Sequence, residues 1–514
     1  MSERPRPAAR TKRRGQYFLA LDFGTSHIKA AIGKGSGEPI ATSSVPVGYS
    51  VPADGPQTAV EFSPDIVWKS ACTAAKRSLR TSGLSARDIA GIGVTSQRFG
   101  LVLIGKDGRE LYAGPNRDAR AVFEGAEIDS TLGHAIWRAT GHGPAVLLAW
   151  SKLVWFQRNQ PDLFDRAEWV LGLSDWLVWR LTGVLALDAS QGVESGLVTV
   201  AAGQSAAVFK SELGLEHIGI PPVCRSGETV GTLKAEPASQ LALAAGIPVV
   251  TCGPDTQVGL VGLGVSDPGQ IGVIAGWSAS VQLVTSAPFF DDTRSMWTGR
   301  HVLKDRWNIE GNAGEMGGAY EWLVSLLSGH PAGPADFKGL ERLAAKTEAG
   351  SRGATAYLGP SFVNMSHVGL RTGGILFPVP LAYEPPDAGS LALAALENFA
   401  FAVRYNVDRL GLIADSWTDV SCGGGMAKSP LFRKLLADCT GRPVGTGAAG
   451  DATARGVLTL TAVATSDEHN IDDLLATRRR ELDMVEPGRS SAAQYQDLYD
   501  SWRLRERRVL DLEL

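Results

Sequence analysis

Two separate stretches of the chain alternate apolar residues with small or polar ones on both sides of a glycine turn. The first stretch, residues 17–32, turns at Gly24, and the second, residues 270–285, turns at Gly276. Such alternation is typical of two strands joined in a hairpin. Because the same design returns about 250 residues later, the pattern indicates a chain built from two related halves.

Helical and extended patterns alternate through the rest of the chain. Helices are predicted over residues 65–80, 150–159, 315–327, 391–410 and 431–439, and strands over residues 89–94 and 101–104. Polar strands and turns are expected over residues 291–307, and a charged, helical end over residues 470–514. This alternation predicts an α/β fold. The turn at residues 266–269 puts the boundary between the halves near residue 265.

Composition and charge narrow the class of protein. With 514 residues, 44% hydrophobic and 20% charged, the chain predicts a globular protein of at least two domains. A net charge of −4 gives no reason to expect nucleic acid or a membrane as partner, and no stretch approaches 18 consecutive apolar residues. Residues 1–16 are interpreted as a disordered basic tail without the apolar core of a secretory signal, so we expect a cytoplasmic protein. Five scattered cysteines predict reduced structural thiols and no zinc site.

An acid and two hydroxyls surround the first glycine turn. Asp22 ends the strand-like run, Thr25 and Ser26 follow Gly24, and Lys29 lies three residues further on. A glycine turn lets backbone N–H groups approach an anion, and one carboxylate beside phosphate oxygens suits Mg²⁺. The turn is therefore a candidate phosphate loop with Asp22 as a candidate metal ligand. Taken alone, a plain hairpin with polar turn residues explains it as well.

A second acid follows an apolar strand in the middle of the chain. Asp255 comes after residues 247–251 and the turn Gly253-Pro254. A carboxylate at a strand end, opposite a phosphate loop, can accept the proton of a substrate hydroxyl as that oxygen attacks phosphorus, which is worth roughly 10²–10⁴ in rate. The alternative for an isolated Pro-Asp-Thr sequence is an aspartate that caps the following helix.

A triple glycine, residues 423–425, precedes the helix predicted over residues 431–439. Small residues at such a place let a flat ligand or a phosphate approach the start of a helix. Alone it is only a loop. The order of the three motifs along the chain predicts that they form one phosphate-handling site.

Taken together, these motifs resemble the FGGY carbohydrate kinases from about Tyr17 to about Val463. The resemblance implies an α/β protein of two related actin/hexokinase-like (ribonuclease H-like) domains with a catalytic cleft between them. It implies an N-terminal domain over residues 17–265 with the sugar site and the first phosphate loop. An ATP-binding C-terminal domain over residues 266–465 and a helical segment over residues 466–514 would follow.

The implied reaction transfers the γ-phosphate of ATP to a hydroxyl, usually a primary one, of a small sugar, ketopentose or polyol. Asp255 would be the general base, and Mg²⁺ would lie near Asp22 and Asp255. The candidate substrate-binding residues are Gln97, Arg98, Asp118, Asp255 and Thr256. The candidate ATP-binding residues are Gly24, Thr25, Ser26, Lys29, Gly276, Ser278, Gly317, Glu321, Gly424, Gly425 and Ser429. A surface salt bridge is the alternative for Arg98.

The chain departs from the family pattern in its second phosphate loop. The family usually has Thr where this chain has Trp277, so a hydroxyl donor is lost and Ser278 and backbone N–H groups remain for the γ-phosphate. In addition, Pro254 replaces a common glycine and stiffens the approach to Asp255.

A further departure concerns the acceptor. Gln97 is followed by Arg98-Phe99 instead of the Met-His typical of xylulokinases. This favours a similarity to the glycerol and autoinducer-2 kinase branches over the pentulose kinases.

Two functions of different classes follow from the resemblance. The first is an ATP-dependent kinase of a small sugar or polyol, with no nucleic-acid or membrane partner and with a homodimer left open. The alternative is an actin-fold sugar- or nucleotide-binding regulator with lost or reduced turnover, which the missing hydroxyl at Trp277 keeps open.

Overall fold

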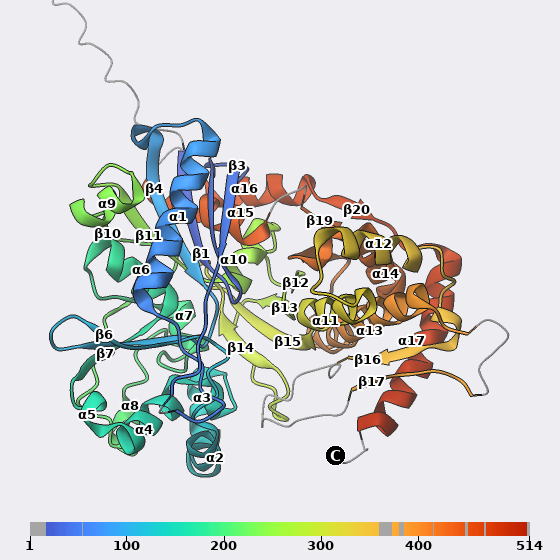
Figure 1. Ribbon diagram of the computed structural model, residues 1–514, viewed down its shortest axis with the longest axis horizontal. Helices are drawn as coiled ribbons and strands as arrows, with labels where there is room; N and C mark the ends of the chain where they lie inside the picture. The colour runs from blue at the N-terminus through green and yellow to red at the C-terminus, as the bar shows by residue number, and fades with distance from the viewer. Residues whose placement is uncertain are drawn as a thin grey trace, which may run out of the picture.

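The computed structural model describes residues 17–53, 55–358, 373–379, 385–414, 416–447, 451–466 and 469–510. The predicted basic tail, residues 1–16, lies outside them. Two lobes lie side by side, each built around a mixed β-sheet that helices cover (Figure 1). The predicted α/β architecture of two halves is confirmed. Among the described residues, no helix combines the length and the apolar character needed to cross a bilayer.

The N-terminal lobe is built on a six-stranded sheet. In spatial order its strands are β10 (Thr229–Thr232), β11 (Pro248–Pro254), β4 (Ile89–Ser96), β1 (Tyr17–Phe23), β2 (His27–Lys34) and β3 (Pro39–Pro46). β1 pairs antiparallel with β2, as predicted, and parallel with β4, which pairs parallel with β11. The carboxyl ends of β1, β4 and β11 therefore meet at one edge, where ligands of open α/β sheets bind.

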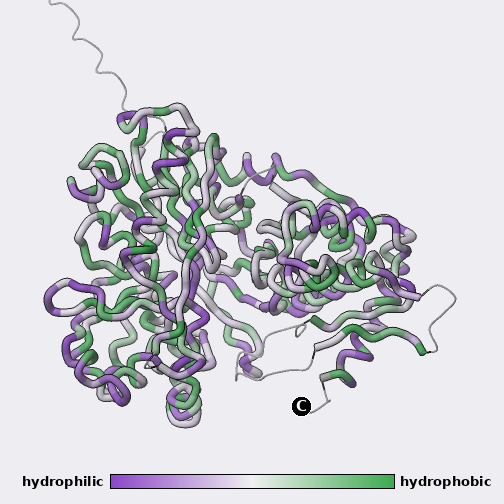
Figure 2. Tube along the Cα trace, viewed as in Figure 1, coloured by the Kyte–Doolittle hydropathy of each residue, from purple (hydrophilic) through white to green (hydrophobic). Residues whose placement is uncertain are grey.

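Helices cover both faces of this sheet. One face packs on α1 (Pro64–Ser82), α6 (Leu173–Thr182) and α9 (Ala235–Leu241). The other face packs on α10 (Asp255–Gly262), α15 (Ala452–Thr465) and α16 (Ile471–Arg480). Figure 2 shows that hydrophobic positions follow the interior strands and helices, whereas hydrophilic ones gather on the outer turns.

α15 comes from the far end of the chain and was not predicted from the sequence. Its Val457 and Leu458 are fully buried in one cluster with Phe18 of β1 and Val250 of β11. Burying each such side chain stabilises the fold by roughly 1.5–3 kcal/mol. A helix that follows the C-terminal sheet thus completes the core of the N-terminal lobe.

A smaller layered unit lies at the edge of the N-terminal lobe. Its sheet has the order β6 (Glu110–Gly114), β5 (Leu101–Gly105) and β7 (Ala167–Gly172). The elements packed around it are α2 (Val122–Thr131), α3 (Gly133–Thr140), α4 (Ala149–Asn159), α5 (Pro161–Phe164), α7 (Ala189–Glu194), α8 (Val208–Leu213), β8 (Leu187–Asp188) and β9 (Val223–Cys224). The predicted strand at residues 101–104 and helix at residues 150–159 are confirmed.

The C-terminal lobe is built on a seven-stranded sheet. In spatial order its strands are β14 (Trp297–Arg300), β15 (Trp307–Glu315), β13 (Ser278–Thr285), β12 (Ile271–Ala275), β18 (Val420–Gly423), β19 (Val444–Thr446) and β20 (Asp483–Val485). β12 and β13 form the second predicted hairpin, and β12 pairs parallel with β18. The two predicted phosphate-binding segments of this lobe therefore lie on adjacent strands.

Five helices and a short strand pair pack with this sheet. They are α11 (Gly317–Ser328), α12 (Pro334–Ala344), α13 (Ala388–Gly411), α14 (Pro430–Thr440) and α17 (Arg489–Leu510), with β16 (Thr355–Tyr357) and β17 (Gly374–Leu376). The predicted helices at residues 315–327, 391–410 and 431–439 are confirmed with shifted ends. α11 begins two residues later than predicted because Glu315 still pairs with Ser278 in the sheet.

A buried lysine supports the corner that follows β4. Phe99 has a φ of 62°, a left-handed conformation that strains an aromatic residue. Its carbonyl accepts a 2.9 Å hydrogen bond from Nζ of Lys152 in α4, which is buried. Burial lowers the pKa of Lys152 to about 8, and the charge of Asp118 opposes this shift. The corner next to the predicted substrate residue Arg98 is therefore held by an ammonium group with a depressed pKa.

The variant Lys152→Met tests this lowered pKa, because it removes a group whose pKa differs between the folded and the unfolded protein. Between the native pKa near 8 and the ordinary value of 10.5, the unfolded lysine keeps its proton while the native one has lost it, so this group makes stability rise with pH. The free energy of unfolding of the wild type minus that of the variant should increase by about 3 kcal/mol across this interval. Urea denaturation at both ends of the interval measures it. The exposed Lys69→Met variant is the control, and a difference as flat as that of the control would contradict the prediction.

Candidate active site

The predicted catalytic acid and the predicted phosphate loop lie at the ends of nearby strands. Asp22 is the second-last residue of β1 and pairs with Thr95 of the parallel strand β4. Asp255 directly follows β11, whose Pro254 pairs with Ser96 of β4. The register of three parallel strands thus brings together two acids that lie far apart in the sequence.

Asp22 is a buried carboxylate with an incomplete set of donors. Its Oδ2 lies 3.7 Å from Nζ of Lys29, its partner on β2, whereas its Oδ1 is buried without a hydrogen-bond partner in the described part of the chain. Burial raises the pKa of Asp22 to about 7 against the opposing charge of Lys29, and the charges of Asp451 and Asp255 raise it further. A buried carboxylate oxygen without a partner is costly, and a bound cation would satisfy it.

Lys29 is shared with an aspartate that was not predicted from the sequence. Asp451 caps α15 by accepting from the backbone N–H groups of Thr453 and Ala454, and its Oδ2 lies 2.7 Å from Nζ of Lys29. Although burial opposes it, Lys29 lowers the pKa of Asp451. The signal available in the sequence was an aspartate directly before an apolar helical run.

Asp255 is the first residue of α10, where a negative charge interacts favourably with the helix dipole. The turn before it is fixed by Gly253, which has a φ of 81° and whose carbonyl accepts a 2.7 Å bond from Thr95. Burial raises the pKa of Asp255 to about 6, and Arg98 and Lys29 oppose this shift. The helix-capping alternative would put the aspartate at the cap position, which Pro254 occupies.

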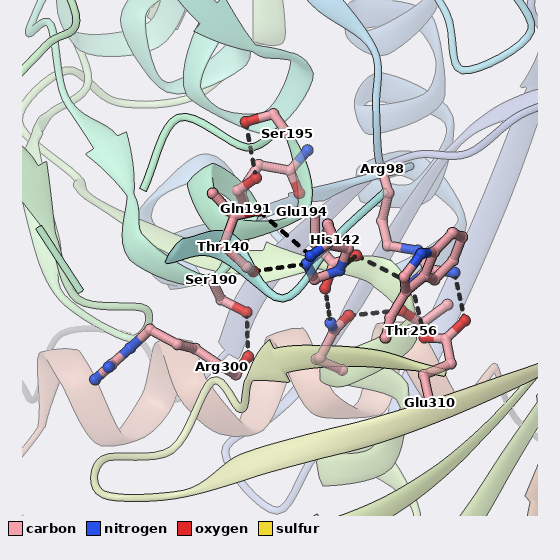
Figure 3. A network of polar contacts seen from close by, with 12 residues as sticks. Arg98, Thr140, His142, Ser190, Gln191, Glu194, Ser195, Thr256, Arg300 and Glu310 are labelled. Atoms are coloured by element: carbon pink, nitrogen blue, oxygen red, sulfur yellow. Dashed lines mark hydrogen bonds and ion pairs between the residues drawn. The ribbon is translucent and has the colours of Figure 1, made fainter. Parts of the chain in front are cut away.

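Arg98 connects the two lobes through buried carboxylates (Figure 3). Its Nη1 and Nη2 donate to the two carboxylate oxygens of Glu310 on β15, at 2.7 and 2.9 Å, and Nη1 also donates to Glu194 at 3.1 Å. Two parallel bonds from a guanidinium to one carboxylate form the strong, directional type of ion pair. The side chain is buried, so the alternative of a surface salt bridge is wrong.

Glu194 extends this ion pair towards α10. It accepts a hydrogen bond from Gln257, whose side-chain oxygen accepts in turn from the hydroxyl of the predicted residue Thr256. It also lies 3.2 Å from Nε2 of His142 (Figure 3). The His142 ring stacks on Trp297 with ring centroids 5.6 Å apart. Carboxylates, an amide and aromatic rings around one point are the groups that bind small polar ligands.

Gln97 forms hydrogen bonds with the predicted first phosphate loop. Its amide nitrogen donates to Gly24 O at 3.4 Å, and its side-chain oxygen accepts from Asn116 N at 3.3 Å. The residue is buried, so it links the first glycine turn to the loop that follows β6.

Asp118 has a different role from the predicted substrate contact. Its fully buried carboxylate accepts from three donors: Val60 N, the Tyr112 hydroxyl and Nε of Arg120, whose single N–H is shared between the two carboxylate oxygens. These donors engage both carboxylate oxygens. Asp118 therefore anchors the loop at residues 115–120, and its contact with the substrate stays a prediction.

Several predicted ATP-binding glycines gather beside the start of α11. Gly276 O, in the turn between β12 and β13, accepts from Gly317 N at 3.2 Å. Gly424 has a φ of 95°, and a Cβ there would lie 2.4 Å from Ala275 O. A Cβ on the exposed Gly425 would meet no atom within 4 Å. The glycines thus join the ends of β12 and β18 and leave one backbone segment open to a ligand.

The remaining predicted ATP-binding residues differ in their surroundings. Thr25 accepts from Asn116 Nδ2 at 3.3 Å, and Ser278 is half-buried. Glu321 is exposed on the second turn of α11. The Ser429 hydroxyl caps α14 and donates to Glu341 of α12 at 2.5 Å, so it orders two helix ends.

Comparison with known proteins identifies the class. Residues 17–262 match the N-terminal domain of the FGGY family of carbohydrate kinases, and residues 272–465 match its C-terminal domain. The chain therefore belongs to the FGGY family of carbohydrate kinases, phosphotransferases with an alcohol group as acceptor. The fold matches the actin/hexokinase-like architecture of this family.

Individual relatives cover almost the whole chain. It is 28% identical over 516 aligned positions to an autoinducer-2 kinase of Escherichia coli, and the alignment covers 95% of this chain and 93% of the relative. It is 29% identical to an autoinducer-2 kinase of Salmonella typhimurium, over 86% of this chain and 85% of the relative. The structure of a xylulose kinase from Rhodospirillum rubrum superposes with a TM-score of 0.79 at 25% identity, over 95% of this chain and 98% of that one.

The variant Arg98→Lys tests the role of the buried ion pair. Lysine keeps the charge but cannot make two parallel bonds to Glu310, so a sugar acceptor should bind more weakly while the nucleotide is unaffected. We expect the KM of the acceptor to rise by about tenfold or more with the affinity for ADP changed by less than about twofold.

The matched control is Arg158→Lys, which alters a bidentate pair with Glu127 on the exposed side of the same lobe. Steady-state kinetics and ADP titration measure both variants. An unchanged acceptor KM in Arg98→Lys, or an equal rise in the control, would contradict a role at the acceptor site.

Proposed function

We propose that this protein transfers the γ-phosphate of ATP to a hydroxyl of a small, neutral sugar or polyol, with Asp255 as the general base. The observation that carries the proposal is the pairing of two acids at the ends of neighbouring strands: Asp22 is buried beside the Gly24 turn, and Asp255 is half-buried at the start of α10, with its charge acting on Asp22. Burial raises the pKa of Asp255 to about 6, which leaves a carboxylate that can accept a proton near neutral pH. Phosphoryl transfer otherwise requires positioning and neutralisation of charge.

The charges at the acceptor side support a neutral acceptor. Arg98 is already paired with both Glu194 and Glu310 in this network. The two carboxylates outnumber it, so a sugar acid would meet net repulsion, whereas hydroxyl groups can donate to carboxylate oxygens. The relatives named autoinducer-2 kinases and the Arg98-Phe99 sequence together favour a short, linear carbonyl-containing polyol, such as autoinducer-2, as the first acceptor to test.

Mg²⁺ is the metal that the acids fit. Mg²⁺ is held by one or two carboxylates together with water and substrate phosphates. Asp22 offers a buried oxygen that has no protein donor in the described residues, and Asp255 lies close enough for its charge to act on Asp22. When bound, the ion would neutralise charge on the phosphates. Lys29 and Asp451 would hold Asp22 in place.

An acceptor panel read out by ADP release tests the proposed function. With Mg-ATP we expect turnover with at least one of autoinducer-2, a ketopentose or a polyol, and none with a sugar acid. Thermal stabilisation by the same compounds reports binding without turnover, because a ligand at 100 times its Kd adds about 2.7 kcal/mol. Binding without any ADP release would favour the regulator alternative over the kinase.

The variant Asp255→Asn should fold and bind ligands but lose about two to four decades of kcat, which is the contribution of a positioned general base. The amide keeps the size of the side chain and cannot accept the proton. Asp107→Asn, in the exposed turn between β5 and β6, is the control. Near-full activity of Asp255→Asn with the best acceptor would show that another group takes the proton.

The variant Asp22→Asn tests the metal site. An amide gives up the charge that binds Mg²⁺, so the affinity for ADP should no longer increase when Mg²⁺ is added, although ADP binding itself remains. Isothermal titration with and without Mg²⁺ measures this in both proteins. A Mg²⁺ effect of the same size in wild type and variant would exclude Asp22 from the metal site.

A further inference from the structure

Trp277, the residue that departs from the family pattern, contacts an arginine of the opposite lobe. Its ring is at the tip of the turn between β12 and β13 and is 39% exposed. The guanidinium carbon of Arg117, in the loop after β6, lies 4.3 Å from the ring centroid. At this distance a cation over an indole ring is attracted by the π electrons. The contact therefore joins the N-terminal lobe to the second phosphate loop.

The indole is held in place from below. A Cβ on Gly318, in the first turn of α11, would lie 2.5 Å from the ring, so the ring packs directly on the helix backbone. Its Nε1 donates to Glu315 Oε1 at 3.4 Å, and the carbonyl of Trp277 accepts from Met316 N at 2.8 Å. The ring of Trp277 is therefore held in place by the backbone of α11, and Arg117 stacks on this ring.

The same arginine lies beside the first phosphate loop. Its neighbour Asn116 donates through Nδ2 to the Thr25 hydroxyl at 3.3 Å, and Tyr49 donates to the carbonyl of Thr25 at 2.5 Å. Burial raises the pKa of Tyr49, and the charge of Arg117 is among the groups that oppose this rise. Arg117 therefore lies between the two turns that are proposed to bind the phosphates of ATP.

The guanidinium keeps its donors available. Arg117 is exposed, and within the described residues it makes no ion pair, not even with Glu315 beneath the same ring. A guanidinium that stacks through its face still presents its N–H groups at the edge, in the geometry that suits phosphate oxygens. Lysine could not combine the two contacts, because its charge is a point at the end of a flexible chain.

We propose that Arg117, held flat on Trp277, is a further phosphate-binding residue that contacts the terminal phosphate of the nucleotide. It supplies the donor that the second phosphate loop lacks without a hydroxyl at position 277. The inference rests on the proposed function of the two turns as phosphate loops. Because Arg117 and its platform belong to different lobes, the contact requires both lobes in the arrangement described here. Donors aimed at the transferred phosphoryl group stabilise the charge that develops on its oxygens.

Nucleotide affinity tests this contact separately from catalysis. The variant Arg117→Ala should bind AMP-PNP, a non-hydrolysable analogue with a third phosphate, about tenfold or more weakly than wild type, while ADP affinity changes by less than about twofold. Both are measured by titration calorimetry with Mg²⁺. Equal effects on ADP and AMP-PNP, or no effect on either, would overturn the proposal. If wild type phosphorylates no acceptor, the proposed function fails, and this comparison still decides the role of Arg117.

A second contact of the same kind provides the matched control. Arg138 of α3 lies 4.7 Å from the ring of Phe290, so it also joins the two lobes through an arginine on an aromatic ring, but outside the phosphate turns. Arg138→Ala should leave the ratio of AMP-PNP to ADP affinity unchanged. A similar loss of that ratio in both variants would mean that Arg117 only joins the lobes, and would overturn the proposal.

The platform is tested by a double-mutant cycle in kcat. Trp277→Phe keeps an aromatic ring and should lose less activity than Trp277→Ala, which should lose as much as Arg117→Ala does. The double variant should be no worse than Arg117→Ala alone, because the ring acts through the arginine. If the double variant instead lost kcat by the product of the two single losses, Arg117 would not depend on Trp277. Trp277→Thr introduces the hydroxyl that the family usually has at this position and should change the KM for ATP or kcat. A variant unchanged in both would contradict the role of Trp277 at the phosphate site.

Discussion

Two acids removed from solvent at the ends of neighbouring parallel strands are the constraint on which the site depends. Burial raises the pKa of both Asp22 and Asp255, and the charges of Asp451 and Asp255 raise the pKa of Asp22 further. The two nearest cations come from other elements, Lys29 from β2 and Arg98 from the corner after β4. Each cation is already paired with an acid supplied by the second half of the chain. The site therefore keeps an excess of negative charge, which is the condition for holding a divalent ion beside phosphates.

The lobes are joined by polar contacts as well as by packing. The ion pair of Arg98 with Glu310 and the contact of Arg117 with Trp277 both cross the boundary between the lobes, one at the proposed acceptor side and one at the proposed phosphate side. Between them, Asp451 brings the start of α15 to Lys29. The contacts of these charged groups therefore depend on how the two lobes are placed against each other.

Much of the fold could be predicted because its signals are local. The two hairpins were visible as alternation around Gly24 and Gly276, and Asp255 as an acid after an apolar strand. Glu310 could not be found in this way, since it lies 212 residues from its partner Arg98 on a strand with no motif of its own. Nor does the sequence reveal that the carboxylate of Asp118 is fully buried and accepts from Val60, Tyr112 and Arg120.

The return of α15 to the N-terminal sheet has a consequence for how the chain can be divided. A fragment ending at the boundary near residue 265 would keep α10 but would leave Phe18 and Val250 without α15, which packs with them in the same cluster. The complementary fragment would carry an apolar helix with no sheet to cover. Although the design is duplicated, neither copy is a self-sufficient folding unit. The two halves of this chain therefore depend on each other for folding, and any exchange of its N-terminal half has to include α15 together with the sheet on which it packs.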